Sequence, residues 1–173
     1  MTGVEWWDVL DEAGKPTGEA FRRGTPGWPA GRFHLIVATC VVRADGSVLL
    51  TRRAVTKSEF PLAWEFPGGS ALAGESSRRA AQRELREETG VEVAEDELEL
   101  VGRFREQSAL LDMYVVAVQG VPVVTVDEAE VDDAAWVTWD DVGARLGAGR
   151  MAEPWVDRLH ALGPGLRSAA VPR

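Results

Sequence analysis

The sequence predicts a single α/β domain in which helices flank a mixed β-sheet. Three observations support this prediction: short β-branched runs recur along the chain, one long helical pattern lies among them, and no linker-like segment divides the chain. The 173 residues are enough to bury one sizeable core. A hydrophobic fraction of 45% and a charged fraction of 27% are ordinary for a globular protein.

Residues 1–31 predict a β-hairpin extension and a loop that belong to the same domain. The runs VEWWDVL and EAFRR predict strands, because turn-forming Asp, Gly and Pro fill the segment DEAGKPTG between them. RGTPGWPAG, residues 23–31, predicts a loop by the same signs. The main body is expected over residues 32–162, and GPGLRSAAVPR, residues 163–173, predicts a flexible tail.

The main body begins with two strands joined by a tight turn. FHLIVATCVV is apolar without interruption, which predicts a buried strand. Asp45 and Gly46 are a strong hairpin signal, and SVLLTRR predicts the returning strand. The loop TKSEFPLA and the short strand WEF follow. Later elements are predicted as strands at LELVGRFREQ, LLDMYVVAVQG and AAWVTW, and as short helices at DDVGARLGAGR and AEPWVDRLHAL.

One long helical pattern runs from residue 74 or 75 to Thr89. Ser76 or Ser77 can cap its first turn, because a hydroxyl there accepts hydrogen bonds from free backbone N–H groups. Gly90 stands where the end of a helix favours a left-handed residue. Both ends of the helix are therefore marked in the sequence.

Three glutamates of this helix, Glu84, Glu87 and Glu88, fall within about 100° of its circumference. They share that arc with Ala80 and Ala81, whereas basic and amide side chains occupy the opposite half. We therefore expect all three carboxylates to face inward or toward a cleft, where unpaired charge is costly. A hard divalent cation such as Mg²⁺ is the natural partner. The alternative is a solvated acidic face without a ligand.

The composition argues against several classes of protein. The chain has 19 Lys and Arg against 28 Asp and Glu, and this net charge of −9 argues against binding to a nucleic-acid scaffold. Its longest apolar run is far shorter than the roughly 20 residues that cross a membrane. The acidic start MTGVEWWDVLDEAG predicts no signal peptide, so we expect a cytoplasmic protein. Cys40, the single cysteine, excludes an internal disulfide and is expected to pack within its strand.

The long helix lies inside a longer motif, GSALAGESSRRAAQRELREETGV, residues 69–91. This motif resembles the Nudix box, G-x5-E-x7-R-E-U-x-E-E-x-G-U, in which U is a bulky aliphatic residue. The resemblance is strict over the box and looser over residues 32–140, and it implies the Nudix fold, a mixed sheet sandwiched between helices. All nine fixed positions match: Gly69, Glu75, Arg83, Glu84, Leu85, Glu87, Glu88, Gly90 and Val91.

The resemblance implies a metal-dependent hydrolase. Nudix enzymes typically use Mg²⁺ or Mn²⁺ and attack by water to cleave the diphosphate linkage of a nucleoside diphosphate derivative. AWEFPGGS is similar to the same segment of Nudix nucleoside triphosphate pyrophosphohydrolases. The implied partner is a small-molecule diphosphate, in the first place a nucleotide. By position, the family's metal ligands correspond to Glu84, Glu87, Glu88 and the backbone of Gly69, with Arg83 and Glu75 orienting the ligating carboxylates.

Further site residues are predicted at strand ends and in a late loop. Arg52 and Arg53 could contact phosphate directly, and a solvated strand end is the alternative. In the family the general base is sometimes a glutamate of the box and sometimes an acid on a later loop. That loop here reads DEAEVDD, in which Asp127, Glu128 and Glu130 are the candidates, and a solvated acidic turn is the alternative.

Two other functions stay open. The N-terminal half, from EWWDVLDEAGKPTGEAFRRG to LLTRRAVTK, is similar to the isopentenyl diphosphate isomerase-like branch of the family, and His34 is similar to a histidine of that branch. A true isomerase of this branch needs a catalytic Cys in the loop that here reads SEFPLAWEFPGG, which has none. A nucleotide-sensing module without catalysis is the other alternative. The N-terminal hairpin is a candidate contact for a homodimer.

Overall fold

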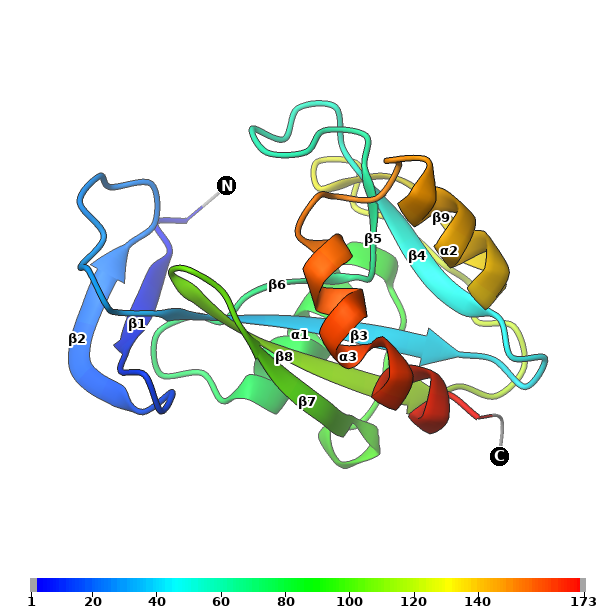
Figure 1. The fold of residues 1–173 in the computed structure, drawn as a ribbon, viewed down its shortest axis with the longest axis horizontal. Coiled ribbons are helices and arrows are strands. Elements are labelled where there is room, and N and C mark those ends of the chain that lie inside the picture. The colour runs from blue at the N-terminus through cyan, green and yellow to red at the C-terminus, as the bar shows by residue number, and fades with distance from the viewer. Residues whose placement is uncertain (1–2, 172–173) are drawn as a thin grey trace.

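The structure is a computed structural model that describes residues 3–171, with one main sheet and helices on both of its faces (Figure 1). Within these residues every helix is too short or too polar to span a bilayer. The elements are the strands β1 (Trp6–Leu10), β2 (Pro16–Arg22), β3 (His34–Val42), β4 (Val48–Arg53), β5 (Trp64–Glu65), β6 (Gly68–Ser70), β7 (Glu99–Arg105), β8 (Ala109–Ala117) and β9 (Val131–Val137), the 3₁₀ turn η1 (Glu95–Glu97), and the helices α1 (Ser77–Thr89), α2 (Trp139–Gly147) and α3 (Trp155–Ala169).

Strands β3 and β8 form the centre of the main sheet. They run parallel and pair over their whole length, and β7 joins β8 in the antiparallel direction. Strand β4 pairs with β3 only at Val42 and Val48, so the two strands diverge beyond their turn. Strand β6 pairs with the first half of β3, and β5 and β9 flank β4. This divergence opens one end of the sheet, which is where the candidate site lies.

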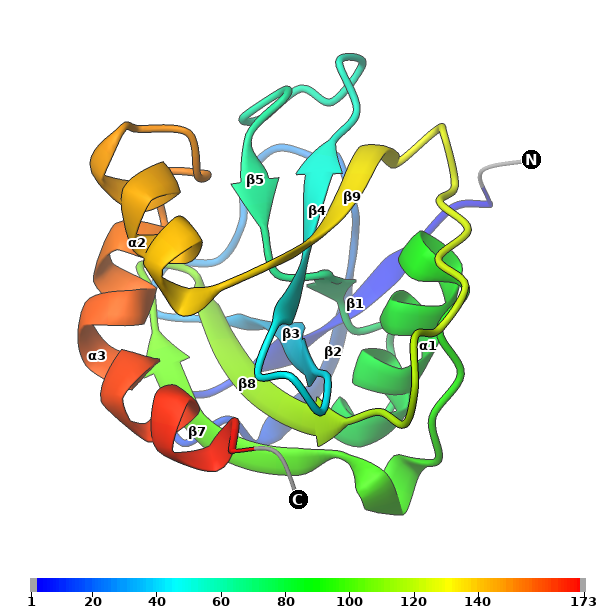
Figure 2. The ribbon, with the colours of Figure 1, turned by 90° about the vertical axis from the view of Figure 1, so that its right-hand side faces the viewer.

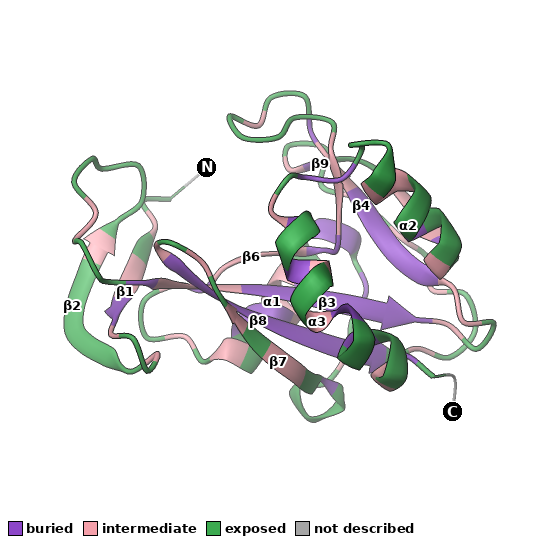
Figure 3. Cartoon of the chain, viewed as in Figure 1, coloured by how far each residue is buried: buried purple, intermediate pink, exposed green. Residues whose placement is uncertain are grey.

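Two apolar clusters cover the two faces of the main sheet. Side chains of β3 alternate between them: Val37 and Val41 pack toward α1, whereas Ala38 and Cys40 pack toward α2 and α3. Figure 2 shows α1 on one side of the strands and the other two helices on the opposite side. Figure 3 shows β3 and β8 buried between these layers. The α/β prediction is confirmed, and Cys40 is fully buried in its strand as expected.

The hairpin β1–β2 is a separate two-stranded sheet at one end of the molecule (Figure 1). Leu10 exchanges two backbone hydrogen bonds with Phe33, at 2.8 and 3.0 Å. The carbonyl of Trp6 accepts a hydrogen bond of 2.8 Å from the backbone N–H of Ala73. The hairpin is thus tied to the start of β3 and to the loop before α1, which places its side chains beside the candidate site.

The C-terminal segment differs from the prediction of a flexible tail over residues 163–173. That prediction followed from the GPG sequence, since Pro and Gly normally end a helix. Helix α3 instead continues through Pro164 to Ala169, and Leu166 is fully buried in the core beside β7. Burial of this side chain outweighs the poor helix propensity of the GPG segment. Residues 172–173 of the predicted tail lie outside the described residues.

Leu166→Ala is expected to lower the free energy of unfolding by about 2–5 kcal/mol, because it leaves a cavity where a fully buried side chain was. Urea unfolding followed by tryptophan fluorescence measures this change. Val156→Ala on the same helix is the control, because Val156 is 51% exposed, and it is expected to shift stability by less than about 0.5 kcal/mol. Equal stabilities for the two variants would contradict the packing of α3 described here.

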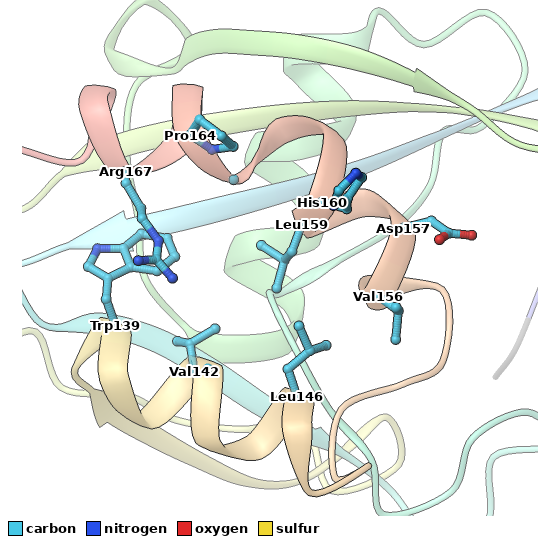
Figure 4. Close-up of a pocket in the computed structure, with 11 residues that line it drawn as sticks. Trp139, Val142, Leu146, Val156, Asp157, Leu159, His160, Pro164 and Arg167 are labelled. Carbon is cyan, nitrogen blue, oxygen red and sulfur yellow. The ribbon is translucent and has the colours of Figure 1, made fainter.

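A groove of about 770 Å³ lies between α2 and α3 (Figure 4). Val142 and Leu146 of α2 and Leu159 of α3 form its apolar walls, and the guanidinium of Arg167 stacks on the ring of Trp139 at 5.3 Å. The residues of α3 that line this groove differ from those that border the candidate site. Helix α3 therefore separates two hollows of the molecule.

Candidate active site

A pocket of about 610 Å³ lies where β3, β6 and α1 meet the hairpin, the loop after β4 and the first turn of α3. Three fixed positions of the Nudix-like motif line it, namely Gly69, Glu84 and Glu88. Arg53 and Glu130, which lie far from the motif in the sequence, line the same pocket. The fold thus brings five of the predicted site residues to one place.

Helix α1 sets the direction of the carboxylates. The hydroxyl of Ser76 accepts a hydrogen bond of 3.3 Å from a backbone N–H of the first turn, and Gly90 ends the helix with a left-handed φ of 70°. The cap and the C-terminal end lie where the sequence predicts them, whereas the helix begins at Ser77, later than the predicted start at residue 74 or 75. Between them Ala80, Ala81 and Leu85 are buried against the sheet, so the acidic arc turns toward the pocket.

Arg83 is the centre of a hydrogen-bond network beside the pocket. Its Nε and Nη2 donate to both carboxylate oxygens of Glu75, at 2.9 and 2.8 Å. Its Nη1 donates to Glu84 at 2.7 Å and to Glu87 at 3.0 Å, and Nη2 also donates to the carbonyl of Ser70 at 3.1 Å. Burial alone would raise the pKa of Glu75, but the hydrogen bonds from Arg83 and from the backbone N–H of Leu72, together with the arginine charges nearby, outweigh burial and lower that pKa. This geometry supports a positioning role for Arg83.

Glu84 lies against the backbone at Gly69. A Cβ atom added to Gly69 would stand 2.6 Å from the carboxylate carbon of Glu84, which is closer than real atoms approach. Glycine therefore allows a carboxylate and a backbone segment to share one small volume, as a cation site with mixed oxygen donors requires. Burial raises the pKa of Glu84, although the neighbouring Arg83 opposes that shift.

Glu88 is buried next to other acids. Only 7% of the residue is exposed, and its Oε2 accepts a hydrogen bond of 3.0 Å from the backbone N–H of Gly68. Burial raises the pKa of Glu88 well above its ordinary value, and the charges of Glu65 and Glu84 act in the same direction. Burial also raises the pKa of Glu65, although Arg53 binds its carboxylate at 2.8 Å. This part of the pocket is short of positive charge.

Glu87 departs from the prediction that all three acids of the arc face inward. Its side chain is 51% exposed, against 15% for Glu84. The helical arc places Glu87 at the edge of the acidic face, and Arg83 holds its carboxylate at the outer side of the network. Arg83 itself was predicted on the opposite half of the helix, but its long side chain bends back to reach the acids.

The side chains of Arg52 and Arg53, at the end of β4, point to opposite sides because successive side chains alternate along a strand. Arg53 lines the pocket and pairs with Glu65. Arg52 does not line it; its Nη2 pairs with Asp132 at 2.5 Å, and its guanidinium lies over the ring of Trp64 at 5.6 Å. Of the two arginines, Arg53 is therefore the better placed for the predicted phosphate contact.

Of the three candidate bases, only Glu130 lines the pocket, where its carboxylate forms an ion pair with Lys57. Asp127 forms the preceding turn: its side chain accepts from the N–H of Ala129 at 3.0 Å, and its carbonyl accepts from the N–H of Glu130 at 2.9 Å. Glu128 is exposed and lies outside the pocket. Position thus favours Glu130 over Glu128.

Several pocket residues were missed by the sequence analysis. A Glu between two aromatic residues in the strand WEF is an unusual pattern, and it could have indicated Glu65. No local pattern indicates the others, because they come from separate segments that only the fold brings together. They are Trp7, Lys57, and the ion pair of Glu106 with Arg158 at 2.6 Å.

The chemistry of the pocket suits a hard divalent cation. Six glutamates and four Lys or Arg side chains line it, which is a formal charge of −2. Within residues 3–171, no three His, Cys, Asp or Glu side chains converge closely enough to enclose an ion in their present rotamers. In this arrangement Glu84 is bound to Arg83, and Glu88 to the N–H of Gly68. The oxygen donors fit Mg²⁺ or Mn²⁺.

Cys40 and His34 do not supply isomerase-like chemistry in this arrangement. Cys40 faces the core on the side of α2 and α3, and burial raises the pKa of its thiol. The ring of His34 borders the pocket and stacks on Trp7 at 4.3 Å. Its Nδ1 lies 3.0 Å from the carbonyl oxygen of Ser108, so Nδ1 carries the proton, and burial lowers the pKa of the ring. Both side chains have structural partners.

Comparison with known proteins agrees with the fold and with the family that the motif resembles. The NUDIX domain family matches residues 32–159. The chain is 32% identical over 151 residues to an uncharacterized Nudix hydrolase of Listeria monocytogenes, a match that covers 84% of this chain and 87% of that protein. This chain therefore belongs to the Nudix family, and it is an enzyme of the diphosphatase and pyrophosphohydrolase class.

Two further comparisons bear on the branch and the fold. An isopentenyl-diphosphate Delta-isomerase of Mycolicibacterium vanbaalenii is 33% identical over 175 residues, covering 92% of this chain and 93% of that protein. A crystal structure from Deinococcus radiodurans has a TM-score of 0.77 with 23% identity, covering 91% of this chain and 99% of that one. At this identity the likeness shows the fold alone. The isomerase-like resemblance of the N-terminal half is confirmed as a similarity.

Proposed function

We propose that this enzyme hydrolyses the diphosphate linkage of a nucleoside diphosphate derivative or a nucleoside triphosphate, with Mg²⁺ or Mn²⁺ as cofactor. The observation that carries this proposal is the placement of two inward carboxylates, Glu84 and Glu88, at the glycine pair of β6 in one pocket. A pocket with a formal charge of −2 would repel a diphosphate on its own. It favours a substrate that arrives together with divalent cations.

The acids of α1 would hold the metal. Glu84, Glu87 and Glu88 supply carboxylate oxygens, and the backbone of Gly69 lies beside Glu84. When bound, the metal would neutralise the diphosphate and lower the pKa of a water. Arg83 holds Glu84 and Glu87 in their relative positions through its hydrogen bonds. Glu88 is held separately by the backbone of β6.

Two residues outside the motif would take part in the reaction, one through the attacking water and one through the substrate. We assign Glu130 as the group that accepts a proton from the attacking water, because it lines the pocket and its side chain is partly exposed there. Lys57 forms an ion pair with this carboxylate at the pocket. Arg53, whose guanidinium is held by Glu65, would bind a phosphate oxygen in the same pocket.

Metal removal tests this function. Purified protein is incubated with Mg²⁺ and ADP-ribose, a dinucleoside polyphosphate or a nucleoside triphosphate in ¹⁸O-enriched water, and products are followed by ³¹P NMR. We expect ¹⁸O in a phosphate product, and a fall in rate of at least about 100-fold after dialysis against EDTA, reversed by added Mg²⁺. Product formation that persists without metal, or no product from any compound, would refute the proposal.

An isomerase is the second candidate, because the isomerase of M. vanbaalenii is similar over most of the chain. The buried position of Cys40 and the absence of Cys from the pocket lining argue against it. NMR of isopentenyl diphosphate incubated with the protein distinguishes the two reactions, since isomerisation forms the dimethylallyl compound and hydrolysis releases phosphate. Calorimetric binding of a nucleotide without any turnover would instead favour a sensing module.

A further inference from the structure

The loop between β4 and β5, residues 54–63, borders the same pocket as the acids of α1. It projects beyond the end of the main sheet (Figure 1). Four consecutive residues of this loop, from Lys57 to Phe60, line the pocket. Phe60 is 39% exposed. A partly exposed apolar residue thus lines the same pocket as Glu84 and Glu88.

The backbone of this loop is strained at two positions. Phe60 and Leu62 have φ values of 49° and 61°, and within residues 3–171 they are the only non-glycine residues with positive φ. Phe60 also precedes Pro61, a position at which the chain favours an extended conformation. Leu62 occupies a turn position that normally takes Gly, since the N–H of Ala63 donates to the carbonyl of Phe60 at 3.2 Å. Strain of this kind gathers at ligand clamps and persists only where the surroundings fix it.

Arg53 fixes the strained loop. Its Nε donates to the carbonyl of Glu59 at 2.9 Å, and its own carbonyl accepts from the N–H of Leu62 at 3.0 Å. A third bond joins the N–H of Arg53 to the carbonyl of Ala63 at 2.9 Å. On the other side of the loop Lys57 pairs with Glu130. Arg53 therefore holds the loop against the pocket, and the same guanidinium binds the carboxylate of Glu65.

We propose that Phe60 is a specificity-determining residue that packs on the organic group carried by the diphosphate of the substrate. This inference rests on the proposed function, which places the diphosphate near Glu84 and Glu88. Phe60 lines the same pocket, where it offers an apolar face to the group beyond the diphosphate. A nucleobase and an isoprenyl chain share the required chemistry, an apolar surface that gains by leaving water. Inorganic pyrophosphate has no such apolar surface.

Calorimetry with Mg²⁺ tests the inference on three probes: ADP, isopentenyl diphosphate and inorganic pyrophosphate. Phe60→Ala is expected to weaken binding of at least one organic diphosphate about tenfold, and to leave the Kd of pyrophosphate unchanged. The organic probe that loses affinity identifies the source of the apolar group. Val55→Ala is the matched control, because Val55 lies in the same loop, is 65% exposed and does not line the pocket.

Leu62→Gly tests whether the strained loop conformation contributes to binding independently of the stability of the fold. Gly adopts a φ of 61° without strain, so the urea midpoint is not expected to fall. The loop becomes less preorganised, and the Kd of the same organic diphosphate is expected to rise several-fold. A Kd unchanged in both Leu62→Gly and Phe60→Ala would overturn the inference.

Four other outcomes decide between this inference and the proposed function. Loss of pyrophosphate affinity in Phe60→Ala, or an equal loss of affinity in Val55→Ala, would overturn the role of Phe60. Wild-type protein that binds an organic diphosphate through Phe60 but hydrolyses nothing would refute the hydrolase and leave the role of Phe60 standing. Wild-type protein that binds none of the three probes would refute the role of Phe60 itself.

Discussion

Glu88→Gln is expected to reduce hydrolysis by at least about 100-fold while making the metal-free protein more stable. The side chain is buried beside Glu65 and Glu84, so its charge is costly when no cation is present. The amide keeps the same shape, and its oxygen can still accept the hydrogen bond from Gly68. We expect a gain in the free energy of unfolding of the order of 1 kcal/mol in EDTA.

Initial rates and urea unfolding in EDTA and in Mg²⁺ measure both effects. In Mg²⁺ the order of stability should reverse, because the metal binds the folded wild type and stabilises it by mass action. Glu92→Gln is the control: it makes the same change of charge at an exposed position just beyond α1. A Glu88→Gln variant with wild-type activity would refute the role of this carboxylate, and a metal-free variant less stable than wild type would refute the account of its burial.

Substitution by alanine is expected to lower mainly stability at Gly68 and mainly activity at Gly69, the two adjacent glycines of β6. A Cβ on Gly68 would stand 2.1 Å from the carbonyl oxygen of Val37, which is backbone and cannot turn aside. Gly68→Ala should therefore cost about 3 kcal/mol of stability. A Cβ on Gly69 would meet the carboxylate of Glu84, which can rotate. Gly69→Ala should therefore cost less than about 1 kcal/mol but lower activity by about 10- to 100-fold.

Each glycine variant is the control for the other. Thermal or urea unfolding gives the two stabilities, and initial rates at a temperature where both variants are folded give the two activities. Gly69→Ala with full activity would show that Glu84 does not need its place against the backbone. Equal loss of stability in both variants would show that Glu84 cannot rotate away from a Cβ at Gly69, contrary to the expected result.

The ends of α1 and its buried face could be predicted because the signals are local. Ser76, Gly90 and the alanines act within one or two turns of the helix, so their spacing alone predicts the element. The same holds for the strand that contains Cys40, whose uninterrupted apolar run matches a strand covered on both faces. The exposure of Glu87 was not predictable in this way, because it depends on the path of a long arginine side chain.

Other features depend on contacts between distant segments, and local patterns could not predict them. Pro164 lies inside a helix because Leu166 finds space in a core built by strands more than 50 residues earlier. Arg52 and Arg53 are alike in sequence, and only the pairing of β4 with β9 directs the first toward Asp132 and away from the pocket. Predictions of this kind require the sheet order before the side chains can be assigned.

The network around Arg83 makes the acids of α1 interdependent. One guanidinium reaches the carboxylates of Glu75, Glu84 and Glu87, and it also reaches a backbone carbonyl of β6 at Ser70. Paired substitutions within this set are therefore not additive in their effects. A helix carrying the same acids, transplanted onto a sheet without that carbonyl, would lose one of the anchors that fix the arginine. The arrangement of these acids therefore depends on α1 and β6 together, and not on the helix alone.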